Sequence, residues 1–350
     1  LISTLLLMGV ATFLIGLLPS AGTIGVAAPI LLVALRFAQG LAVGGEWAGA
    51  TLLAAEYAPP KRRGLYGVFP QLGPALAFAL STLTFLAVNL FVGEASPAFV
   101  SWGWRVPFLL SALLVLVGLY VRLKVEETPM FRAVAADGDG TRPRGNGPLV
   151  DAFRHQWREI LVAAGALAML FAFFYIGTAY LTSYGTAVVG LSRAQVLSMG
   201  LLASVVFGVT ITVSGIWSDR VGRRRLLGIS CALSVPWGLL LFPIIDGGGA
   251  MGFAIGLIGT LAIFGISYGP AGALLPEMFR TEYRYTGAGT AYNLAGVLGG
   301  ATAPILAAEL SVSHGSGAVG WMLAGFGLLS LVSVLLLPET RDREMHVVQD

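Results

Sequence analysis

Two ionisable residues lie well inside a long apolar stretch of this 350-residue sequence, where charge is costly. Arg36 and Glu46 both fall between residues 26 and 53. An unpaired charge in the apolar interior of a membrane costs at least about 3 kcal/mol, so each needs a partner or a water-filled cavity. They are about 15 Å apart along a helix and cannot pair directly. Arg36 is a candidate for binding a carboxylate through its fork of N–H donors, and Glu46 is a candidate proton carrier.

Both residues also have a structural interpretation. Arg36 could bond the carbonyl groups of a helix end, and Glu46 could form a buried hydrogen bond to a neighbouring helix. Gln39 lies one turn after Arg36 on the same helix face and would share either role.

Hydroxyl side chains are dense near residue 180, where the sequence contains Tyr175, Thr178, Tyr180, Thr182 and Tyr184. At 100° per residue, Tyr175 and Thr182 share a helix face, and Thr178 lies near it. Tyr180 and Tyr184 form a second stripe. An aromatic belt at the membrane surface would account for Tyr184 and partly for Tyr180, whereas Tyr175 lies too deep for it. We therefore expect Tyr175 to line a cavity.

Gln71, Tyr292 and Asn293 are further polar residues in apolar surroundings. Such side chains tie helices together more often than they touch a ligand. Both interpretations stay open for these three residues.

The composition places these residues on membrane-spanning helices. The chain is 56% hydrophobic and 11% charged, which is too apolar for a water-compatible surface. Apolar runs of about 20 residues predict helical spans, and no alternation of polar and apolar residues favours a barrel. Ten spans are expected near residues 1–18, 26–53, 65–91, 104–122, 159–184, 195–217, 226–245, 251–274, 286–308 and 318–337.

The basic residues indicate how these spans are oriented. Of the 21 Lys and Arg residues, 18 lie in alternate joints, at residues 61–63, 122–158, 220–225, 280–284 and 341–343. Joints rich in Lys and Arg stay on the cytoplasmic side, so we expect these loops and the C-terminus to be cytoplasmic in a cell (inner) membrane. The net charge of +3 arises in these loops, which face anionic lipid, and it gives no argument for nucleic acid.

An internal repeat relates the two sides of the chain. A shift of 221 residues places Glu56 on Glu277 and Arg63 on Arg284, so that each copy has a span ending in Glu and an Arg seven positions later. Such duplicated halves are typical of membrane transporters.

A polar segment separates the two copies. Residues 124–158 lack apolar periodicity and predict a flexible cytoplasmic linker between an N-terminal half, residues 1–123, and a C-terminal half, residues 159–350. The second half has six spans and the first has four. Because duplicated halves match in helix number, we expect two helices to precede Leu1.

Several motifs resemble one family of membrane proteins. Residues 215–225, GIWSDRVGRRR, resemble the GxxxDRxGRR loop of the major facilitator superfamily. Residues 36–47, 62–67, 102–108 and 125–129 look like the metabolite:proton symporters within it. The resemblance implies an all-α membrane protein with the major facilitator fold, of which ten of twelve transmembrane helices are present. It also implies secondary active transport, as a proton-coupled symporter of a small organic acid or zwitterionic metabolite that works by alternating access.

This resemblance implies that charged residues in the joints form a gate. Alternating access needs a gate that closes one side and still opens, and exposed charge pairs worth on the order of 1 kcal/mol each suit that. The expected gating residues are Asp219, Arg220, Arg223, Glu277 and Arg284 in the second half and Glu56 and Arg63 in the first. The expected substrate-binding residues are Arg36, Gln39, Gln71, Tyr175, Thr178, Tyr180, Tyr292 and Asn293, with Glu46 for proton coupling. The alternative is that the basic loops only set the orientation.

Other classes of protein fit the sequence less well. The histidines lie in joints or termini, and Cys231 is the single cysteine, so no metal site is expected. Neither Lys61 nor Lys124 follows a GxxxxGK pattern, which disfavours a nucleotide-driven protein. We expect no enzyme activity and no cofactor, and we expect a monomer whose partners are a small metabolite, a proton and the lipid bilayer.

Two alternatives to symport stay open. Gly73-Pro74 matches part of the glycine-proline motif of proton-coupled drug or solute antiporters of the same superfamily, although Leu76-Ala77 stands where the doubled glycine should follow. The other alternative is an inactive fragment, because two cavity helices would be missing.

Overall fold

The computed structural model describes residues 2–93, 96–124 and 147–343, and its regular elements within these residues are all helices. Eight of the described helices are long and apolar enough to cross a membrane. A further apolar helix, α1 (Ile2–Leu17), is shorter, and one of the eight, α12 (Arg223–Met278), contains two spans because Gly249 breaks it with φ 53° and ψ −134°. The described residues therefore contain the ten spans that the sequence predicts.

Contacts between the helices group the chain into two units. Unit 1 comprises Leu1–Leu53 with Thr84–Gly147, and unit 2 comprises Ala54–Leu83 with Pro148–Asp350. Residues 54–83 thus pack with the second part of the chain. The two halves that the repeat indicates, residues 1–123 and 159–350, remain a prediction.

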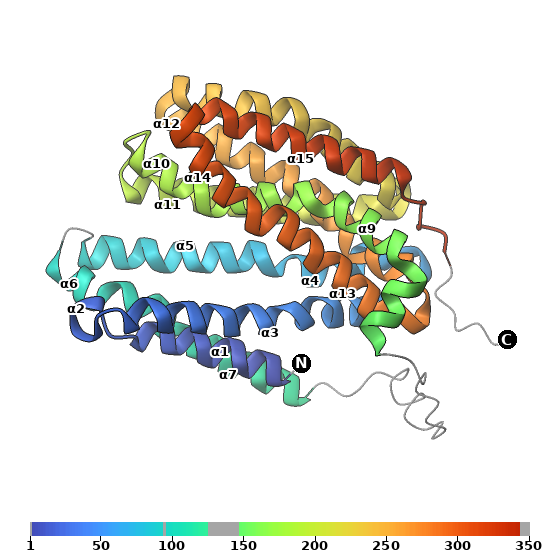
Figure 1. Ribbon diagram of the computed structural model, residues 1–350, viewed down its shortest axis with the longest axis horizontal. Helices are drawn as coiled ribbons and strands as arrows, with labels where there is room; N and C mark the ends of the chain where they lie inside the picture. The colour runs from blue at the N-terminus through green and yellow to red at the C-terminus, as the bar shows by residue number, and fades with distance from the viewer. Residues whose placement is uncertain (1, 94–95, 125–146, 344–350) are drawn as a thin grey trace. The chain divides into compact units, whose positions relative to one another are not determined.

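In unit 1, α1 packs along α7, and Arg105, which directly precedes α7, forms hydrogen bonds with the C-terminal end of α1. The elements are α1, α2 (Ala21–Ile24), α3 (Ala27–Tyr57), α6 (Pro97–Ser101), η2 (Gly103–Arg105) and α7 (Val106–Lys124), drawn in Figure 1. Gly9 of α1 faces Val115 of α7 so closely that a Cβ would collide with that side chain. Arg105 Nη1 donates to the carbonyls of Gly16 (2.9 Å) and Leu18 (2.6 Å). Arg105 therefore satisfies carbonyl groups that the end of α1 leaves unpaired.

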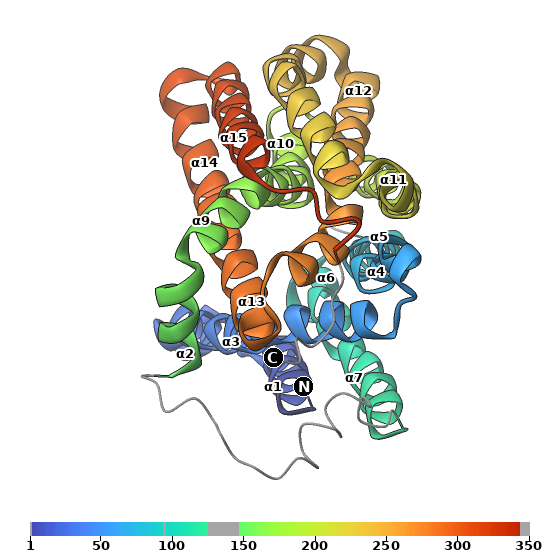
Figure 2. The ribbon, with the colours of Figure 1, turned by 90° about the vertical axis from the view of Figure 1, so that its right-hand side faces the viewer.

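Unit 2 is a larger bundle in which α15 runs beside α9 and α12 (Figure 1, Figure 2). Its helices are η1 (Pro60–Arg62), α4 (Arg63–Gln71), the first part of α5 (Gly73–Val92), α9 (Pro148–Tyr175), α10 (Leu181–Ala187), α11 (Arg193–Val221), α12, η4 (Thr281–Tyr283), α13 (Arg284–Ala295), α14 (Thr302–His314) and α15 (Ser316–Leu336). Two π-helical turns, η3 (Ile176–Tyr180) and η5 (Gly296–Ala301), interrupt the spans that begin with α9 and α13.

The start of α9 differs from the sequence expectation. α9 begins at Pro148, so residues 148–158 are helical, although we expected them to belong to an irregular linker before a span from residue 159. The backbone departs from helical angles at Gln156, with φ −134° and ψ 31°. The remaining linker residues 125–146 lie outside the described residues.

α4 crosses α11 and α12 at close range because glycines lie at the crossing. Gly64 touches the carbonyl of Gly215 on α11, where a Cβ would overlap it. On α12, a Cβ at Gly272 would lie 2.8 Å from the carbonyl oxygen of Gly67, which is closer than real Cβ atoms come. Glycine at these positions lets the backbones touch. The crossing brings the N-terminus of α4 to the charged loop between α11 and α12.

Candidate functional site

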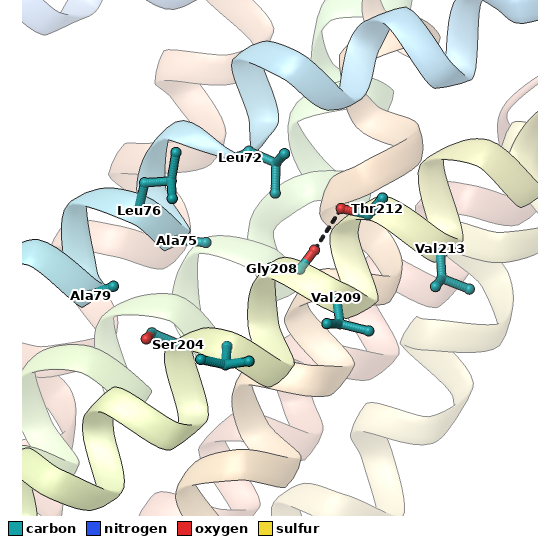
Figure 3. A pocket seen from close by; sticks show the side chains of 10 residues that line it. Leu72, Ala75, Leu76, Ala79, Ser204, Gly208, Val209, Thr212 and Val213 are labelled. Atoms are coloured by element: carbon teal, nitrogen blue, oxygen red, sulfur yellow. Dashed lines mark hydrogen bonds between the residues drawn. The ribbon is translucent and has the colours of Figure 1, made fainter.

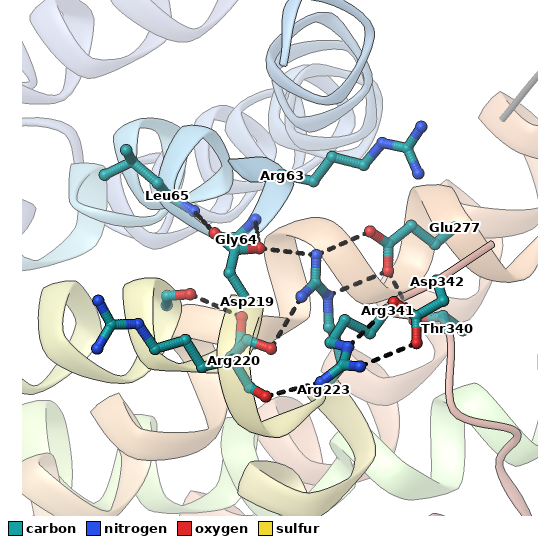
Figure 4. Close-up of polar contacts among 12 residues, drawn as sticks. Arg63, Gly64, Leu65, Asp219, Arg220, Arg223, Glu277, Thr340, Arg341 and Asp342 are labelled. Atoms are coloured by element: carbon teal, nitrogen blue, oxygen red, sulfur yellow. Dashed lines mark hydrogen bonds and ion pairs between the residues drawn. The ribbon is translucent and has the colours of Figure 1, made fainter. Parts of the chain in front are cut away.

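The charged loops of unit 2 meet at one end of this unit, where α4, α11, α12 and the segment after α15 come together (Figure 4). The loop between α11 and α12 is short: α11 ends at Val221, α12 begins at Arg223, and Gly222 between them has φ 102°. Only glycine adopts this conformation without strain. The tight turn explains why the GxxxDRxGRR pattern contains its second glycine, and it folds Arg223 back onto Asp219.

Arg223 lies at the centre of this site. Its guanidinium makes a two-point contact with Glu277, with Nε 3.2 Å from Oε2 and Nη2 3.0 Å from Oε1. Nη2 also lies 3.0 Å from Oδ1 of Asp219, and Nη1 donates to the Ser218 carbonyl at 2.9 Å. The side chains of Arg223 and Glu277 are 1% and 0% exposed, so the pair is closed off from water. We call Asp219, Arg223 and Glu277 the Arg223 cluster.

Asp219 connects this cluster to α4. Its Oδ1 accepts from the backbone N–H of Gly64 at 2.7 Å, and its Oδ2 accepts from that of Leu65 at 3.0 Å (Figure 4). The first N–H groups of a helix have no partner within the helix, and the helix dipole favours a negative charge beside them. One carboxylate therefore caps α4 and pairs with Arg223 at the same time.

The segment after α15, residues 338–343, lies across the Arg223 cluster. The buried Thr340 donates from Oγ1 to Oε2 of Glu277 at 2.7 Å. Glu339 accepts from the backbone N–H groups of Arg223 (2.8 Å) and Arg224 (3.2 Å), which are the first residues of α12. Glu339 thus caps α12 in the same way that Asp219 caps α4.

Two arginines attach the same segment to its surroundings. Arg341 Nη1 donates to the carbonyl of Arg220 at 2.7 Å, and Arg63 Nη1 donates to the carbonyl of Arg343 at 2.6 Å. Arg341 also donates to Asp342 at 3.0 Å, and this hydrogen bond lowers the pKa of the exposed Asp342 carboxyl. Arginine side chains therefore attach the last residues of the segment to the rest of unit 2 through bonds to main-chain carbonyl groups.

The remaining expected gating residues lie around this site with less direct contacts. Arg63 is buried and reaches the cluster through the C-terminal segment. Glu56 and Arg284 interact electrostatically with each other. Arg220 is exposed and contributes its carbonyl group to the contact with Arg341.

Sequence reasoning did not assign Glu339 and Thr340 to this site. The only signal was their place at the end of the last span, with a similar Glu-Thr pair at residues 127–128 at the end of another. That second pair lies outside the described residues.

In unit 1, the two intramembrane charges have different surroundings. Arg36 Nη1 donates to Oε1 of Gln39 at 3.2 Å, and Nε2 of Gln39 donates to Oγ1 of Thr12 at 2.6 Å. Arg36 and Gln39 thus form a chain that ties α3 to α1. Glu46 lies on α3 and is partly exposed. The expected roles of these three residues remain predictions.

The hydroxyl-bearing residues of η3 and its neighbours point in different directions. Tyr175 is 41% exposed, and its ring packs edge-on against Phe174 at 5.4 Å. Thr178 Oγ1 donates to the Phe174 carbonyl at 2.7 Å. The Tyr180 hydroxyl is buried, and no hydrogen-bond partner for it occurs among the described residues. Tyr184 instead donates to Oδ1 of Asp246 at 2.6 Å.

Gln71 and Tyr292 are joined through Tyr268 on α12. Gln71 is fully buried, and its Nε2 donates to the Tyr268 carbonyl at 2.7 Å. The hydroxyls of Tyr268 and Tyr292 lie 3.1 Å apart, and Phe171 packs edge-on against the Tyr292 ring at 4.8 Å. Asn293 Nδ2 donates to the Gly289 carbonyl at 2.9 Å. These contacts fit the interpretation that Gln71 ties helices, and contact with a substrate remains a prediction for the set.

The described part of the chain contains no group of His, Cys, Asp and Glu side chains that could hold a metal ion. The charged site is therefore built from ion pairs and helix caps. Such contacts can hold helix ends together, and they can be exchanged for water when the helix ends separate.

Similar sequences are transport proteins. The inner membrane metabolite transport protein YhjE of Escherichia coli K12 is 43% identical, over 99% of this chain and 78% of that protein. The shikimate transporter of the same organism is 35% identical, over 97% of this chain and 77% of that one. The ectoine/proline transporter ProP of Corynebacterium glutamicum is 31% identical, over 98% and 70%.

The fold is shared with solved structures. The proton:xylose symporter XylE bound to 6-bromo-6-deoxy-D-glucose superposes with a TM-score of 0.70, covering 98% of this chain and 82% of that one at 20% identity. This likeness shows the fold alone. The model of the Major Facilitator Superfamily matches residues 1–304. With ten membrane spans, transport proteins as relatives and a family match over most of its length, this chain belongs to the Major Facilitator Superfamily.

Proposed function

We propose that this protein is a proton-coupled symporter of a small organic acid or zwitterionic metabolite that works by alternating access. The observation that carries the proposal is the double role of Asp219. Its carboxylate caps α4, which lies in the predicted first half, and it pairs with Arg223, which lies in the second. A contact of this kind must break when the pathway opens at this end, so it acts as a gate.

The gate can open because only a few hydrogen bonds join the two predicted halves at this end. Arg223 and Glu277 both belong to the predicted second half, so their pair stays intact when the halves separate. Opening breaks the two hydrogen bonds from the N–H groups of α4 to Asp219 and the one from Arg63 to the Arg343 carbonyl, each worth about 1.5–3 kcal/mol because one partner is charged. Hydrogen bonds to the water that enters the open gate offset part of this cost.

The basic loops set the proposed orientation. Arg223 and Arg341 lie near the N-terminus of α4 (Figure 4), and the exposed Lys61 and Arg62 directly precede that helix. Positive charge is retained on the cytoplasmic side, so the gate and the C-terminal segment face the cytoplasm.

The proposed substrate class rests on the intramembrane charges and on the relatives. Arg36 is the candidate to bind a substrate carboxylate, and Glu46 is the candidate to carry the proton. Relatives of this chain are named as transporters of shikimate, of ectoine and proline, and of glycine betaine with pipecolic acid. Each of these solutes carries a carboxylate. In the structure, Arg36 donates to Gln39, and a carboxylate would replace that bond.

Uptake into proteoliposomes tests the proposal. We expect an inward proton gradient to drive accumulation of at least one labelled solute among shikimate, proline and glycine betaine, and a protonophore to abolish it. Efflux of cationic dyes driven by the gradient, with no solute accumulated, would favour the antiporter instead. If a sodium gradient drove uptake with no proton gradient and no membrane potential present, and a protonophore left that uptake unchanged, proton coupling would be excluded.

A further inference from the structure

An apolar groove runs between α5 and α11 within unit 2 (Figure 3). Its walls are Leu72 with the α5 residues up to Ala79 and the α11 residues from Ser204 to Val213, and its volume is about 370 Å³. The two wall hydroxyls are already used, since Ser204 Oγ donates to the carbonyl of Leu201 (2.6 Å) and Thr212 Oγ1 donates to that of Gly208 (2.8 Å). The groove therefore presents almost only hydrocarbon to the molecule that fills it.

The groove has free space at Gly208 and is open to the surroundings along its rims. A Cβ placed on Gly208 would lie 3.8 Å from Ala75 and 3.8 Å from Leu72, which is ordinary contact distance, so the missing side chain leaves room there. The rims Leu76 and Val209 are 61% and 55% exposed. Both helices are membrane spans, so the molecules available to enter from this side are lipid chains.

Exposed basic residues lie at one end of the groove, at the depth of the lipid headgroups. The exposed Lys61 and Arg62 precede α4, and the exposed Arg220 lies near the end of α11. At 1.5 Å per residue, Arg220 is about 10 Å beyond the groove residue Val213, and Arg62 is about 15 Å beyond Leu72. Trp217, between Arg220 and the groove, is exposed, as is typical of aromatic residues at the membrane surface.

We infer that this groove is a binding site for an anionic phospholipid, with one acyl chain between α5 and α11 and the headgroup phosphate beside Lys61, Arg62 and Arg220. Lipid tails are as apolar as the groove walls, so the walls alone give no preference over bulk lipid. The preference comes from the cations, because each Lys or Arg near the headgroup attracts anionic lipid. The inference goes beyond the proposed function and does not depend on transport.

Native mass spectrometry of the detergent-solubilised protein tests this site with phosphatidylglycerol and phosphatidylcholine of identical acyl chains. We expect one retained phosphatidylglycerol, preferred over phosphatidylcholine by about fivefold or more, which corresponds to the attraction of at least one cation. Gly208→Leu should fill the groove and abolish the retention. Gly325→Leu is the matched control, because Gly325 lies on the exposed face of α15 with nothing within 4 Å, and it should retain the lipid.

Two further variants separate the chain site from the headgroup site. Ala79→Leu fills the other end of the groove and should reproduce Gly208→Leu, which guards against a folding defect of either variant. Arg62→Gln should reduce the preference for phosphatidylglycerol over phosphatidylcholine about fivefold. Equal lipid retention by Gly208→Leu and wild type, or equal retention of the two lipids by wild type, would overturn the inference.

Discussion

Arg223 and Glu277 form a fork-to-fork ion pair that is removed from water, with N···O distances of 3.2 and 3.0 Å and side-chain exposures of 1% and 0%. The two residues come from the start and the end of α12, on either side of its break at Gly249. The pair therefore holds the two spans of α12 together at this end. Removal of one partner leaves a buried charge, which is more costly than the loss of the pair itself.

A double-mutant cycle on this pair is the first prediction. Arg223→Met and Glu277→Met should each destabilise the protein by about 3–5 kcal/mol, and the double variant should lose less than the sum of the two. Reversible unfolding of the purified protein in mixed micelles measures the three free energies. The control pair is Arg341→Met with Asp342→Met, an exposed pair whose coupling should be much smaller than that of Arg223 with Glu277. Additive effects at Arg223 and Glu277 would show that the pair does not act as a unit.

The second prediction concerns the cap on α4. Asp219→Asn removes the negative charge that Gly64 and Leu65 share, so the closed gate should open more often and labelling at the α4 crossing should rise. Val68→Cys is a suitable reporter because Val68 is buried against Gly215, and a cysteine fits the space of a valine. Cys231, the single native cysteine, is buried and gives a low background.

The readout is the rate of maleimide labelling in membranes. We expect a rate at least about tenfold higher in Asp219→Asn than in the Val68→Cys parent, since the loss of a charged cap of about 1.4 kcal/mol or more shifts the equilibrium by that factor. Arg225→Gln is the control, because Arg225 is an exposed residue of α12 outside the Arg223 cluster. Unchanged labelling in Asp219→Asn would remove Asp219 from the gate.

Sequence reasoning found the spans because a lipid-exposed backbone permits little besides long apolar helices. It also named Asp219 and Arg223 from the resemblance to the GxxxDRxGRR loop and Glu277 from the internal repeat, and their gating role stays a prediction. The Glu339 cap could not be found in this way. Its contact with Arg223 joins residues that are 116 positions apart, and only the packing of α15 against α12 brings them together.

Arg36 shows a second limit of sequence reasoning. A lone cation in an apolar run indicates either a ligand or a structural tie, and the two alternatives have the same sequence signature. In the structure the side chain donates to Gln39, three residues away, and Gln39 reaches Thr12 on α1. The sequence could not reveal Thr12 as the third member, because threonines are common in membrane helices.

The third prediction concerns Glu339, which caps α12. Glu339→Gln keeps the length of the side chain and removes its charge from the N-terminus of the helix, so we expect a loss of about 1 kcal/mol in unfolding free energy. Glu309→Gln on the exposed face of α14 is the matched control and should change stability by less than about 0.5 kcal/mol. Equal effects of the two substitutions would mean that the cap contributes nothing to stability.

The fourth prediction concerns Glu46, the proposed proton carrier. Glu46→Gln cannot take up or release a proton, so accumulation driven by a proton gradient should be lost. Exchange of labelled for unlabelled substrate across the membrane needs no net proton movement and should persist at a rate within about threefold of wild type, that is, within about 0.7 kcal/mol. Proteoliposomes loaded with unlabelled substrate measure exchange, and the same vesicles with an imposed proton gradient measure accumulation.

The split between exchange and accumulation distinguishes a coupling residue from a structural one, because a variant that misfolds loses both activities. Glu46→Asp keeps the carboxyl group and should retain part of the accumulation. If Glu46→Gln accumulated substrate as wild type does, the proton would have to travel by another group, and the assignment of Glu46 would be withdrawn.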